Sequence, residues 1–421
     1  MTNSAPGTAA TSKQIGDWIS TFSSITETPV EAGVTRLGYS VLERTAHTEF
    51  TDFMRGLGLT VWTDAAGNTI AEKPGSEPNC GFIGTGSHLD SVPLGGRFDG
   101  TAGVVIAMAT AETIVRAGVQ HRHTLRFVAF ACEEGARFGR ACIGSRIVAG
   151  LTRSEDLGSL VDADGVSASA AMRAVGIDPS RVDEARWVSG DWAAFVEVHI
   201  EQGSVLAVED VPVGIVDVIS GSTRLSITLT GTAAHTGGTP MRLRRDALCA
   251  AAEVVLFVEQ LASDDQHDGT RITVGKLDVL PGSITTIPGQ CTLAIDIRDV
   301  DGARQRAVSE TVLARAAEIA QRRGIGYESR QLADASPEQL SPKIQAAIAA
   351  SCEDEQIRYR FMASGASHDT QMVSGICPAG MIFVPSRNGG VSHAPGEFTE
   401  VEDLVRGADL LASVLLRLDA E

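Results

Sequence analysis

The sequence has no long uninterrupted run of apolar residues. The apolar stretch 103–115 is broken by Glu112, and no segment approaches the roughly 20 apolar residues that a membrane-spanning helix needs. The first residues, MTNSAPGTAATSKQ, are small and polar and lack the apolar core of a secretion signal. We therefore expect a disordered tail over residues 1–14, a cytoplasmic protein and no membrane partner.

The sequence has fewer basic than acidic residues. The chain has 35 Lys and Arg against 53 Asp and Glu, which gives a formal net charge of −18. A surface that binds nucleic acid carries a basic patch, and an anionic membrane attracts basic rather than acidic chains. The charge balance therefore argues against a nucleic-acid partner and against a membrane surface.

Paired cysteines are also absent. The 7 Cys residues are scattered, and their spacing argues against a disulfide framework. Four of them lie within or beside apolar runs: Cys80, Cys132, Cys249 and Cys291. We expect these four to be buried, reduced thiols.

The sequence is long enough to form two domains. It has 421 residues, of which 43% are hydrophobic and 21% are charged, as in ordinary globular proteins. Buried-strand runs alternate with helical spacing before residue 213 and after residue 333. The expected helices are 15–24, 39–57, 100–115, 343–354 and 401–418, with a broken helical region at 146–176; the expected strands are 59–63, 68–73, 80–85, 123–131, 195–203 and 380–386. This order predicts an α/β fold with a mixed sheet.

A different pattern occupies residues 214–332. Alternating apolar and polar residues predict half-solvated antiparallel strands at 224–231, 271–279, 290–300 and 327–333, with helices at 244–263 and 303–323. The order strand, helix, strand, strand, helix, strand predicts a ferredoxin-like sandwich. We therefore expect a main domain at 15–213 and 333–421, interrupted by an inserted ferredoxin-like α+β domain at 214–332.

The stretch GSHLDSVPLGGRFDG, residues 86–100, lies between a predicted strand and a predicted helix. Open α/β sheets place their sites at such crossovers, beyond the carboxyl end of a strand. Imidazole and carboxylate groups are zinc- or manganese-type ligands, so we interpret His88 and Asp99 as metal ligands. Asp90 is close enough in sequence to orient the second ring nitrogen of His88. The alternative is a polar loop without a metal.

Further ligand-type residues follow the other predicted strands. CEEG follows one strand, another ends in HIEQ, and a late Gly-rich loop contains SHAPGE. Two metals bridged by a carboxylate are a known arrangement for activating water in hydrolysis. The ligands predicted for two such ions are His88, Asp99, Glu134, His199 and His393.

Glu133 and Glu134 are the most informative pair. Two buried neighbouring carboxylates would repel each other, and a cation removes this repulsion. One of the two can bind metal while the other takes the proton from the water that the metals activate. The alternative is an exposed acidic turn at the end of a strand.

These motifs together resemble a known family. GSHLDSVPLGGRFDG, ACEEGARFG, VEVHIEQG, GTAAHTGGTPMRLRRDA, SGASHDTQ and GGVSHAPGEFT are similar to signature motifs of the amidase/carbamoylase family. That family contains N-carbamoyl-L-amino acid hydrolases, allantoate amidohydrolases and β-ureidopropionases, within the dinuclear metallopeptidase and aminoacylase superfamily. The resemblance extends from about Ile15 to Leu418.

The resemblance implies a role for each metal-site residue. One metal would be held by His88, Asp99 and His199, and the other by Asp99, Glu134 and His393, so that Asp99 bridges them. Glu133 would act as the general base and later as the general acid. The cofactor would be two divalent ions per subunit, of Zn, Mn or Co.

It also implies substrate contacts. The Gln202 amide would hold a ureido group, and His235, from the inserted domain, would polarise the scissile carbonyl, in its own subunit's site or in the partner's. Arg298 would bind the substrate carboxylate as a bidentate fork; without the resemblance, Arg298 is better interpreted as a surface charge between two Asp residues. The Gly389, Gly390 and Ser392 loop would offer backbone donors to that carboxylate.

One position departs from the family pattern. Members usually carry an Asn in the segment before the Arg-bearing strand, and Thr285 stands there in this chain. An Asn side chain both donates and accepts, whereas Thr is shorter and offers one hydroxyl. The departure leaves the substrate open.

The sequence therefore predicts a metal-dependent amidohydrolase that cleaves the linear C–N bond of a small carboxylate-bearing substrate. An N-carbamoyl-L-amino acid is the leading substrate. The enzyme alternatives act on allantoate or another ureido acid, or on an N-acyl amino acid or dipeptide. A non-catalytic metal-binding scaffold is the alternative of another class. The inserted domain is expected to act as a lid and to pair two chains into a homodimer.

Overall fold

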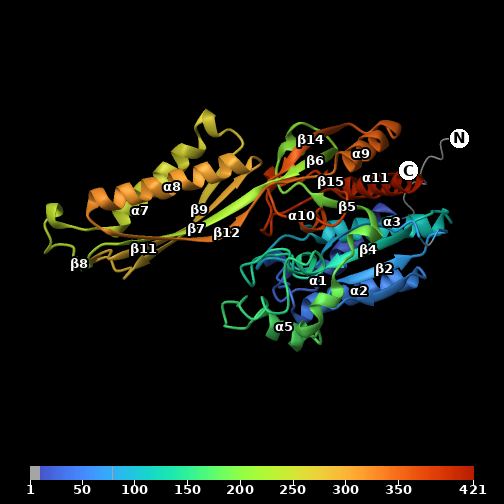
Figure 1. Ribbon diagram of the computed structural model, residues 1–421, viewed down its shortest axis with the longest axis horizontal. Coiled ribbons are helices and arrows are strands. Elements are labelled where there is room, and N and C mark those ends of the chain that lie inside the picture. The colour runs from blue at the N-terminus through green and yellow to red at the C-terminus, as the bar shows by residue number, and fades with distance from the viewer. Residues whose placement is uncertain (1–9, 78) are drawn as a thin grey trace. The chain divides into compact units, whose positions relative to one another are not determined.

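The computed structural model describes residues 10–77 and 79–421, so the first nine residues of the predicted tail lie outside the described chain. The chain divides into two compact units (Figure 1). Unit 1 extends to Asp217 and resumes from Leu340 to Glu421, and unit 2 is Val218–Gln339. The predicted boundaries of the insertion were 214 and 332.

A mixed sheet forms the centre of unit 1. Its strands follow the order β1 (Thr60–Thr63), β2 (Thr69–Lys73), β4 (Thr124–Phe130), β3 (Phe82–His88), β5 (Trp192–Ile200), β15 (Ala379–Val384) and β6 (Val213–Ile219), and β14 (Tyr359–Ser364) also pairs with β6. The four central strands, β4, β3, β5 and β15, are parallel to one another, and the outer pairings are antiparallel. The predicted α/β fold with a mixed sheet is confirmed.

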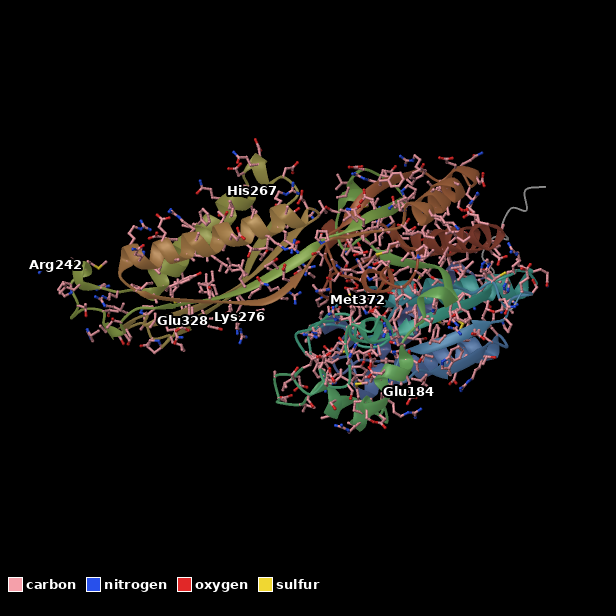
Figure 2. All side chains as sticks on the ribbon, in the orientation of Figure 1. Glu184, Arg242, His267, Lys276, Glu328 and Met372 are labelled. Atoms are coloured by element: carbon pink, nitrogen blue, oxygen red, sulfur yellow. The ribbon has the colours of Figure 1, made fainter. Side chains whose placement is uncertain are left out.

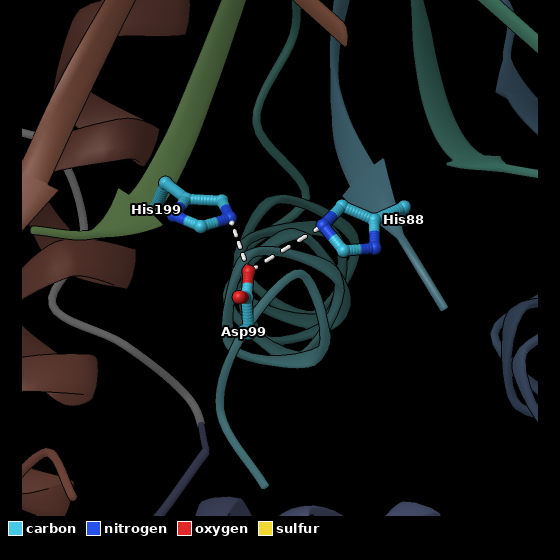
Figure 3. Close-up of side chains that lie close together, drawn as sticks. All are labelled: His88, Asp99 and His199. Atoms are coloured by element: carbon cyan, nitrogen blue, oxygen red, sulfur yellow. Dashed lines mark ion pairs between the residues drawn. The ribbon is translucent and has the colours of Figure 1, made fainter. Parts of the chain in front are cut away.

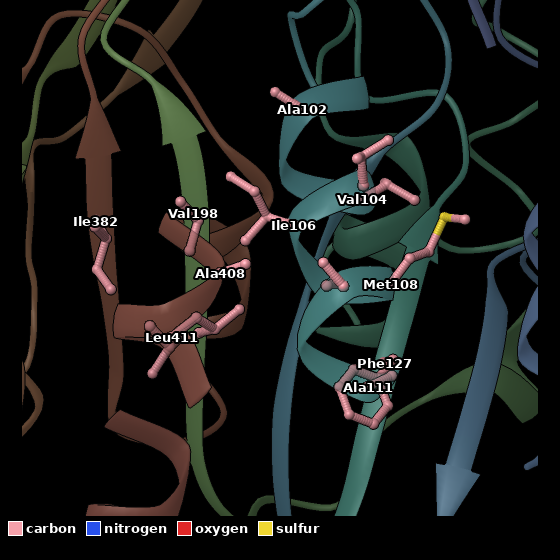
Figure 4. Packing of buried hydrophobic residues seen from close by; sticks show 14 of the residues in the cluster. Ala102, Val104, Ile106, Met108, Ala111, Phe127, Val198, Ile382, Ala408 and Leu411 are labelled. Carbon is pink, nitrogen blue, oxygen red and sulfur yellow. The ribbon is translucent and has the colours of Figure 1, made fainter. Parts of the chain in front are cut away.

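Helices cover both faces of this sheet because its central strands are apolar on both sides. On β4, Phe127 and Ala129 belong to one buried cluster, and Val128 and Phe130 belong to the other. The first cluster includes residues of α1 (Ser12–Ser24), α2 (Val41–Gly56), α3 (Thr101–Arg116), α9 (Pro342–Asp354) and α11 (Val401–Ala420); Figure 4 shows α3 and α11 packed on the strands. The second includes residues of the short helices α4 (Ile143–Val148), α5 (Ala168–Ala174) and α10 (Asp369–Val373).

The start of α3 brings backbone close to the end of β3. Gly100 caps the helix with φ of 62°, and a Cβ atom there would lie 2.4 Å from the His88 ring. Glycine is therefore required at this position for both its conformation and its size. The crossover that the sequence predicted to carry the site is held tightly against the strand.

Unit 2 is a four-stranded antiparallel sheet with two helices. Its sheet order is β12 (Gly326–Ala335), β7 (Gly221–Thr230), β11 (Gln290–Asp299) and β9 (Arg271–Leu280), and its helices are α7 (Ala247–Ala262) and α8 (Gly302–Arg323). Alternate residues such as Leu225, Ile227 and Leu293 form a core with both helices. Lys276 and Glu328 lie on the opposite face (Figure 2). A two-stranded sheet of β8 (Ala234–His235) and β10 (Thr286–Ile287) extends this unit.

The remaining elements are short. They are α6 (Val205–Val208), β13 (Glu338–Gln339) and the 3₁₀ turns η1 (Val30–Ala32), η2 (Pro179–Ala185), η3 (Ser189–Asp191), η4 (Met241–Leu243), η5 (Asp265–His267) and η6 (Asn388–Gly390). Within the described residues, no helix is long and apolar enough to cross a membrane.

Three sequence expectations need correction. The predicted tail is too long, because α1 begins at Ser12, with the Thr11 side chain accepting from Gln14 N–H. The cysteines are free, and Cys132 and Cys291 are buried as expected, but Cys249 is exposed and Cys80 is partly exposed. Cys249 lies on the solvent side of α7, which an apolar run in a helix with one buried face cannot reveal.

Candidate active site

The predicted ligands converge at one edge of the unit 1 sheet. His88 ends β3, Glu133 and Glu134 follow β4, and His199 lies near the end of β5. Parallel strands end at the same edge of a sheet, so these side chains come together although they are far apart in sequence. The loop after β15 brings His393 to the same place.

Asp99 lies between two histidines (Figure 3). Its Oδ1 is 3.2 Å from Nε2 of His199 and 3.6 Å from Nε2 of His88, and all three residues are buried. The other ring nitrogen of His199 lies 2.8 Å from the carbonyl oxygen of Ile200, which leaves Nε2 directed at Asp99. This is the first predicted ligand set.

The second oxygen of Asp99 faces the second predicted set. Oδ2 lies 3.1 Å from Nε2 of His393, and the same nitrogen is 3.6 Å from Oε1 of Glu134. In each set the ligand atoms all lie within 4.8 Å of one another. Asp99 thus belongs to both sets, as a bridging carboxylate would.

The donor set fits divalent metal ions. Imidazole and carboxylate are the ligands that zinc, manganese and cobalt share. Oε1 of Glu134 is buried without a hydrogen-bond partner among the described residues. Burial, together with the nearby Asp99 and Glu133, raises the pKa of Glu134 well above its usual range. A cation would satisfy this oxygen and remove the repulsion.

The Asp99 carboxylate favours the protonated form of the three histidines around it, His88, His199 and His393. Hydrogen bonding to Asp99 raises the pKa of His393 to about 9, although burial opposes the shift. Burial alone would raise the pKa of Asp99, but contacts with His199, His393 and His88 hold it well below its usual range. Metal binding would therefore displace protons from the imidazoles.

Glu133 lies beside these sets without belonging to either. Its Oε2 is 3.9 Å from Nε2 of His88, and its Oε1 accepts a hydrogen bond from Sγ of Cys142 at 2.9 Å. Burial raises the pKa of Glu133, partly offset by His88. A carboxylate with a raised pKa is suited to taking and returning a proton. The sequence did not point to Cys142, since a lone thiol nine residues downstream carries no pattern.

Asp90 contacts both His88 and the glutamate pair. Nδ1 of His88 lies 3.2 Å from the backbone carbonyl oxygen of Asp90 and 3.5 Å from its carboxylate. The two carboxylate oxygens accept the backbone N–H groups of Glu133 and Glu134 at 2.9 and 3.0 Å. Sequence reasoning expected the first contact and missed the second.

The predicted substrate residues of unit 1 lie near Asp99. Nε2 of Gln202 donates to Oδ2 of Asp99 at 2.7 Å, and it lies 3.3 Å from Oγ of Ser392. The backbone N–H of Gly390 donates to the carbonyl oxygen of Arg387 at 3.0 Å. In this structure the 3₁₀ turn uses the N–H donor of Gly390, and the expectation that this loop offers backbone donors to a substrate carboxylate stays a prediction.

The other predicted substrate residues belong to unit 2. His235 lies on β8, and Thr285 directly precedes β10, which pairs with β8. Both residues are exposed, and Thr236 N–H donates to Thr285 O at 3.1 Å. Nδ1 of His235 accepts N–H groups from Gly237 and Gly238, both at 3.1 Å. Arg298 lies on β11 with its Nε 2.9 Å from Oδ2 of Asp296.

Sequence reasoning missed Glu397, although it lies in the quoted motif SHAPGE. Its buried carboxylate accepts the backbone N–H groups of Phe98 and Asp99 at 2.8 and 2.9 Å. It also missed Arg36, a buried guanidinium that donates to Leu89 O and Thr101 Oγ1 on either side of the 90–100 loop. His368, which lies in the quoted motif SGASHDTQ, packs edge-on against His199 with ring centroids 4.5 Å apart.

A family model matches residues 84–417, and it describes peptidase family M20/M25/M40. The chain belongs to this family. The resemblance to the amidase/carbamoylase group is confirmed by the relatives described next. Hydrolases of the family are metal-dependent, and the two ligand sets are where such an ion would be held.

The relatives match the chain over nearly its whole length. An N-carbamoyl-L-amino acid amidohydrolase of Geobacillus stearothermophilus is 40% identical over 387 residues, 92% of this chain and 93% of the relative. An allantoate amidohydrolase of Escherichia coli is 34% identical and covers 95% of this chain and 96% of the relative. A crystal structure of an amidase of the hydantoinase/carbamoylase family from Burkholderia vietnamiensis aligns with a TM-score of 0.89 at 30% identity, covering 100% of both chains.

Proposed function

We propose that this protein is a metal-dependent amidohydrolase that cleaves the linear C–N bond of an N-carbamoyl-L-amino acid or a related ureido acid. One observation carries the proposal. Glu133 is buried and belongs to neither ligand set, but it lies beside the two sets of ligand residues that share Asp99. A scaffold that only bound metal would need no such spare carboxylate next to the ions.

The site residues divide the chemistry between them. His88, Asp99 and His199 would hold one divalent ion, and Asp99, Glu134 and His393 would hold the other. Two bound ions would supply Lewis-acid polarisation and make water more acidic. Glu133 takes the proton from the attacking water and returns it to the leaving nitrogen. Asp90 keeps Glu133 in place through the backbone N–H bond.

His235 has the tautomer that a carbonyl-polarising donor needs. Its Nδ1 accepts two backbone N–H groups, so in the neutral ring the proton lies on Nε2. The ring is exposed, which leaves the Nε2–H group available to donate. Such a donor would stabilise the negative charge that develops on the substrate oxygen.

Geometry within unit 2 supports a homodimer. Arg298 pairs with Ser222 at the start of β7, while His235 follows the end of β7 at Thr230. Eight residues of extended strand span roughly 25 Å, more than a small ureido acid can bridge. If both residues serve one substrate, they must come from different chains. We therefore propose that His235 acts in the active site of a partner subunit.

Among the ureido acids, allantoate is the second candidate substrate. The similarity to the allantoate amidohydrolase of Escherichia coli supports it. Thr285, which lacks the amide of the family pattern, leaves the choice between the two open. N-acyl amino acids remain a third class, because the metal and proton chemistry would be the same.

Ammonia release separates these candidates. The protein is chelated, reloaded with Mn²⁺, Zn²⁺ or Co²⁺, and offered carbamoyl amino acids, allantoate and acyl amino acids. Ammonia together with a free amino acid supports the lead, and ammonia from allantoate alone supports the second class. A free amino acid without ammonia supports a deacylase. No turnover of any substrate by metal-loaded protein would overturn the proposal.

A further inference from the structure

Glu397 links two loops that carry metal ligands. The first loop, 96–99, ends at Asp99, and the second, 387–398, contains His393. The second loop is closed at its base by a hydrogen bond from Arg387 N–H to Phe398 O at 2.7 Å. Glu397 lies at this base and is buried, with 2% of its surface exposed.

One carboxylate oxygen of Glu397 holds the first loop. Oε1 accepts from the N–H groups of Phe98 and Asp99 at 2.8 and 2.9 Å. A Cβ atom on Gly96 would lie 2.0 Å from this oxygen, so glycine is needed there to admit the carboxylate. The contact reaches the backbone of the bridging ligand itself.

The other oxygen holds the second loop. Oε2 accepts from Oγ of Ser392 at 2.7 Å, next to His393 in sequence. The same hydroxyl lies 3.3 Å from Oδ2 of Asp99, but it has one proton and the shorter contact is to Glu397. The Ser392 hydroxyl thus joins the loop of His393 to Glu397.

We propose that Glu397 is a positioning residue of the metal centre, which holds Asp99 and His393 at the separation that one ion requires and adds a negative charge behind it. This rests on the proposed two-metal function. Groups that orient ligands from behind typically change metal affinity by 10- to 100-fold when removed.

The test is a titration of the metal-free, full-length protein with Co²⁺, followed by visible absorption. Glu397→Gln keeps the shape but removes the charge and one acceptor. We expect wild type to bind two Co²⁺, and the variant to bind one of them 10- to 100-fold more weakly with an altered spectrum. The matched control is Asp419→Asn, because Asp419 also accepts two backbone N–H groups, those of Arg122 and His123. These precede the amino end of β4, whereas the proposed ligand Glu134 follows its carboxyl end. The control should bind both ions as wild type does.

The outcomes separate this inference from the proposed function. Wild type that binds no Co²⁺ contradicts the two-metal function. Wild type that binds two ions, with Glu397→Gln indistinguishable from it in affinity and spectrum, overturns the positioning role alone. If Glu397→Gln does not fold, Ser392→Ala and Ser392→Thr decide: affinity should fall in the first and recover in the second, where the hydroxyl is restored. Equal affinity in these two would overturn the inference.

Discussion

Oδ1 of Asp90 accepts a hydrogen bond from the backbone N–H of Glu133 at 2.9 Å. Its other oxygen accepts the N–H of Glu134 at 3.0 Å, so one carboxylate holds the turn that presents both glutamates. Asp90 stands two residues after His88, the last residue of β3. It therefore joins the ends of β3 and β4 at the point where the proposed base and a proposed ligand follow β4.

Replacing Asp90 by Asn should disturb this turn without leaving a cavity. Asn keeps one acceptor oxygen but directs an NH₂ group at the second N–H, which loses one hydrogen bond. We expect kcat to fall about 10- to 100-fold. The measurement is steady-state kinetics with metal content determined on the same sample, with Asp419→Asn as control. Wild-type kinetics in Asp90→Asn would show that the turn does not need this carboxylate.

The two glutamates should respond differently to amide substitution. Glu133→Gln should retain both metals and lose about 10²- to 10⁴-fold in kcat, because the proton shuttle is removed. Glu134→Gln should instead lose affinity for one ion, since an amide is a weaker ligand than a carboxylate. Elemental analysis and kinetics on both variants test the division. Normal metal content and normal turnover in both would exclude it.

Mixed dimers should reveal the role of His235. A His235→Ala chain and a Glu133→Gln chain are each expected to be nearly inactive. When the two are mixed and allowed to exchange, a hybrid contains one intact site if His235 serves its partner, so part of the activity should return. Recovery is compared with each variant mixed with itself. A monomeric mass by light scattering at micromolar concentration would contradict this prediction.

Thr285→Asn should change substrate preference. Asn restores a donor and an acceptor, worth about 0.5–1.5 kcal/mol for a neutral net hydrogen bond and about 1.5–3 kcal/mol for one to a charged group. We expect kcat/KM for simple N-carbamoyl-L-amino acids to rise by roughly 2- to 100-fold, and to fall for the natural substrate. One substrate panel run on both proteins measures this. If the ratio of kcat/KM values across the panel is the same in both proteins, Thr285 does not determine substrate preference.

His47 should make unit 1 sensitive to acid. His47 is buried in α2, where its Nδ1 lies 2.8 Å from Oγ1 of Thr69. Burial lowers the pKa of His47 well below its usual value, and the positive charges of Arg44 and Arg36 lower it further. Below about pH 6.5 His47 binds a proton in the unfolded chain but not in the folded chain. The free energy of unfolding is therefore at its full value above that pH and decreases as the pH falls. The loss is about 1.4 kcal/mol per pH unit. Urea unfolding of wild type and His47→Gln between pH 7.5 and 5.5 should show a smaller loss in the variant.

Much of the fold was predictable from local pattern. The period of apolar residues predicted β4, β5 and β15 and the antiparallel strands of unit 2, because the period reports how many faces of a strand are buried. The region 146–176 was less predictable: only Ile143–Val148 and Ala168–Ala174 are helical, and Gly and Asp residues interrupt the pattern. β14 was missed because its residues are mostly half-exposed and its pairing with β6 is distant in sequence.

The sequence by itself determined which residues could hold metal, because His88, Glu134 and His199 each stand at or just beyond a predicted strand, and parallel strands end at a shared edge. It also predicted that the neighbouring carboxylates of Glu133 and Glu134 would repel each other unless a nearby cation offset their charge. Only the tertiary structure decided that Gly390 donates its own N–H within a 3₁₀ turn, and that Glu397 accepts the N–H groups of Phe98 and Asp99. It also directed the two carboxylate oxygens of Asp99 at different ligand sets. The Glu397 contacts join residues 299 and 298 positions apart. All of these directions depend on how the loops fold and pack rather than on any periodicity along the chain.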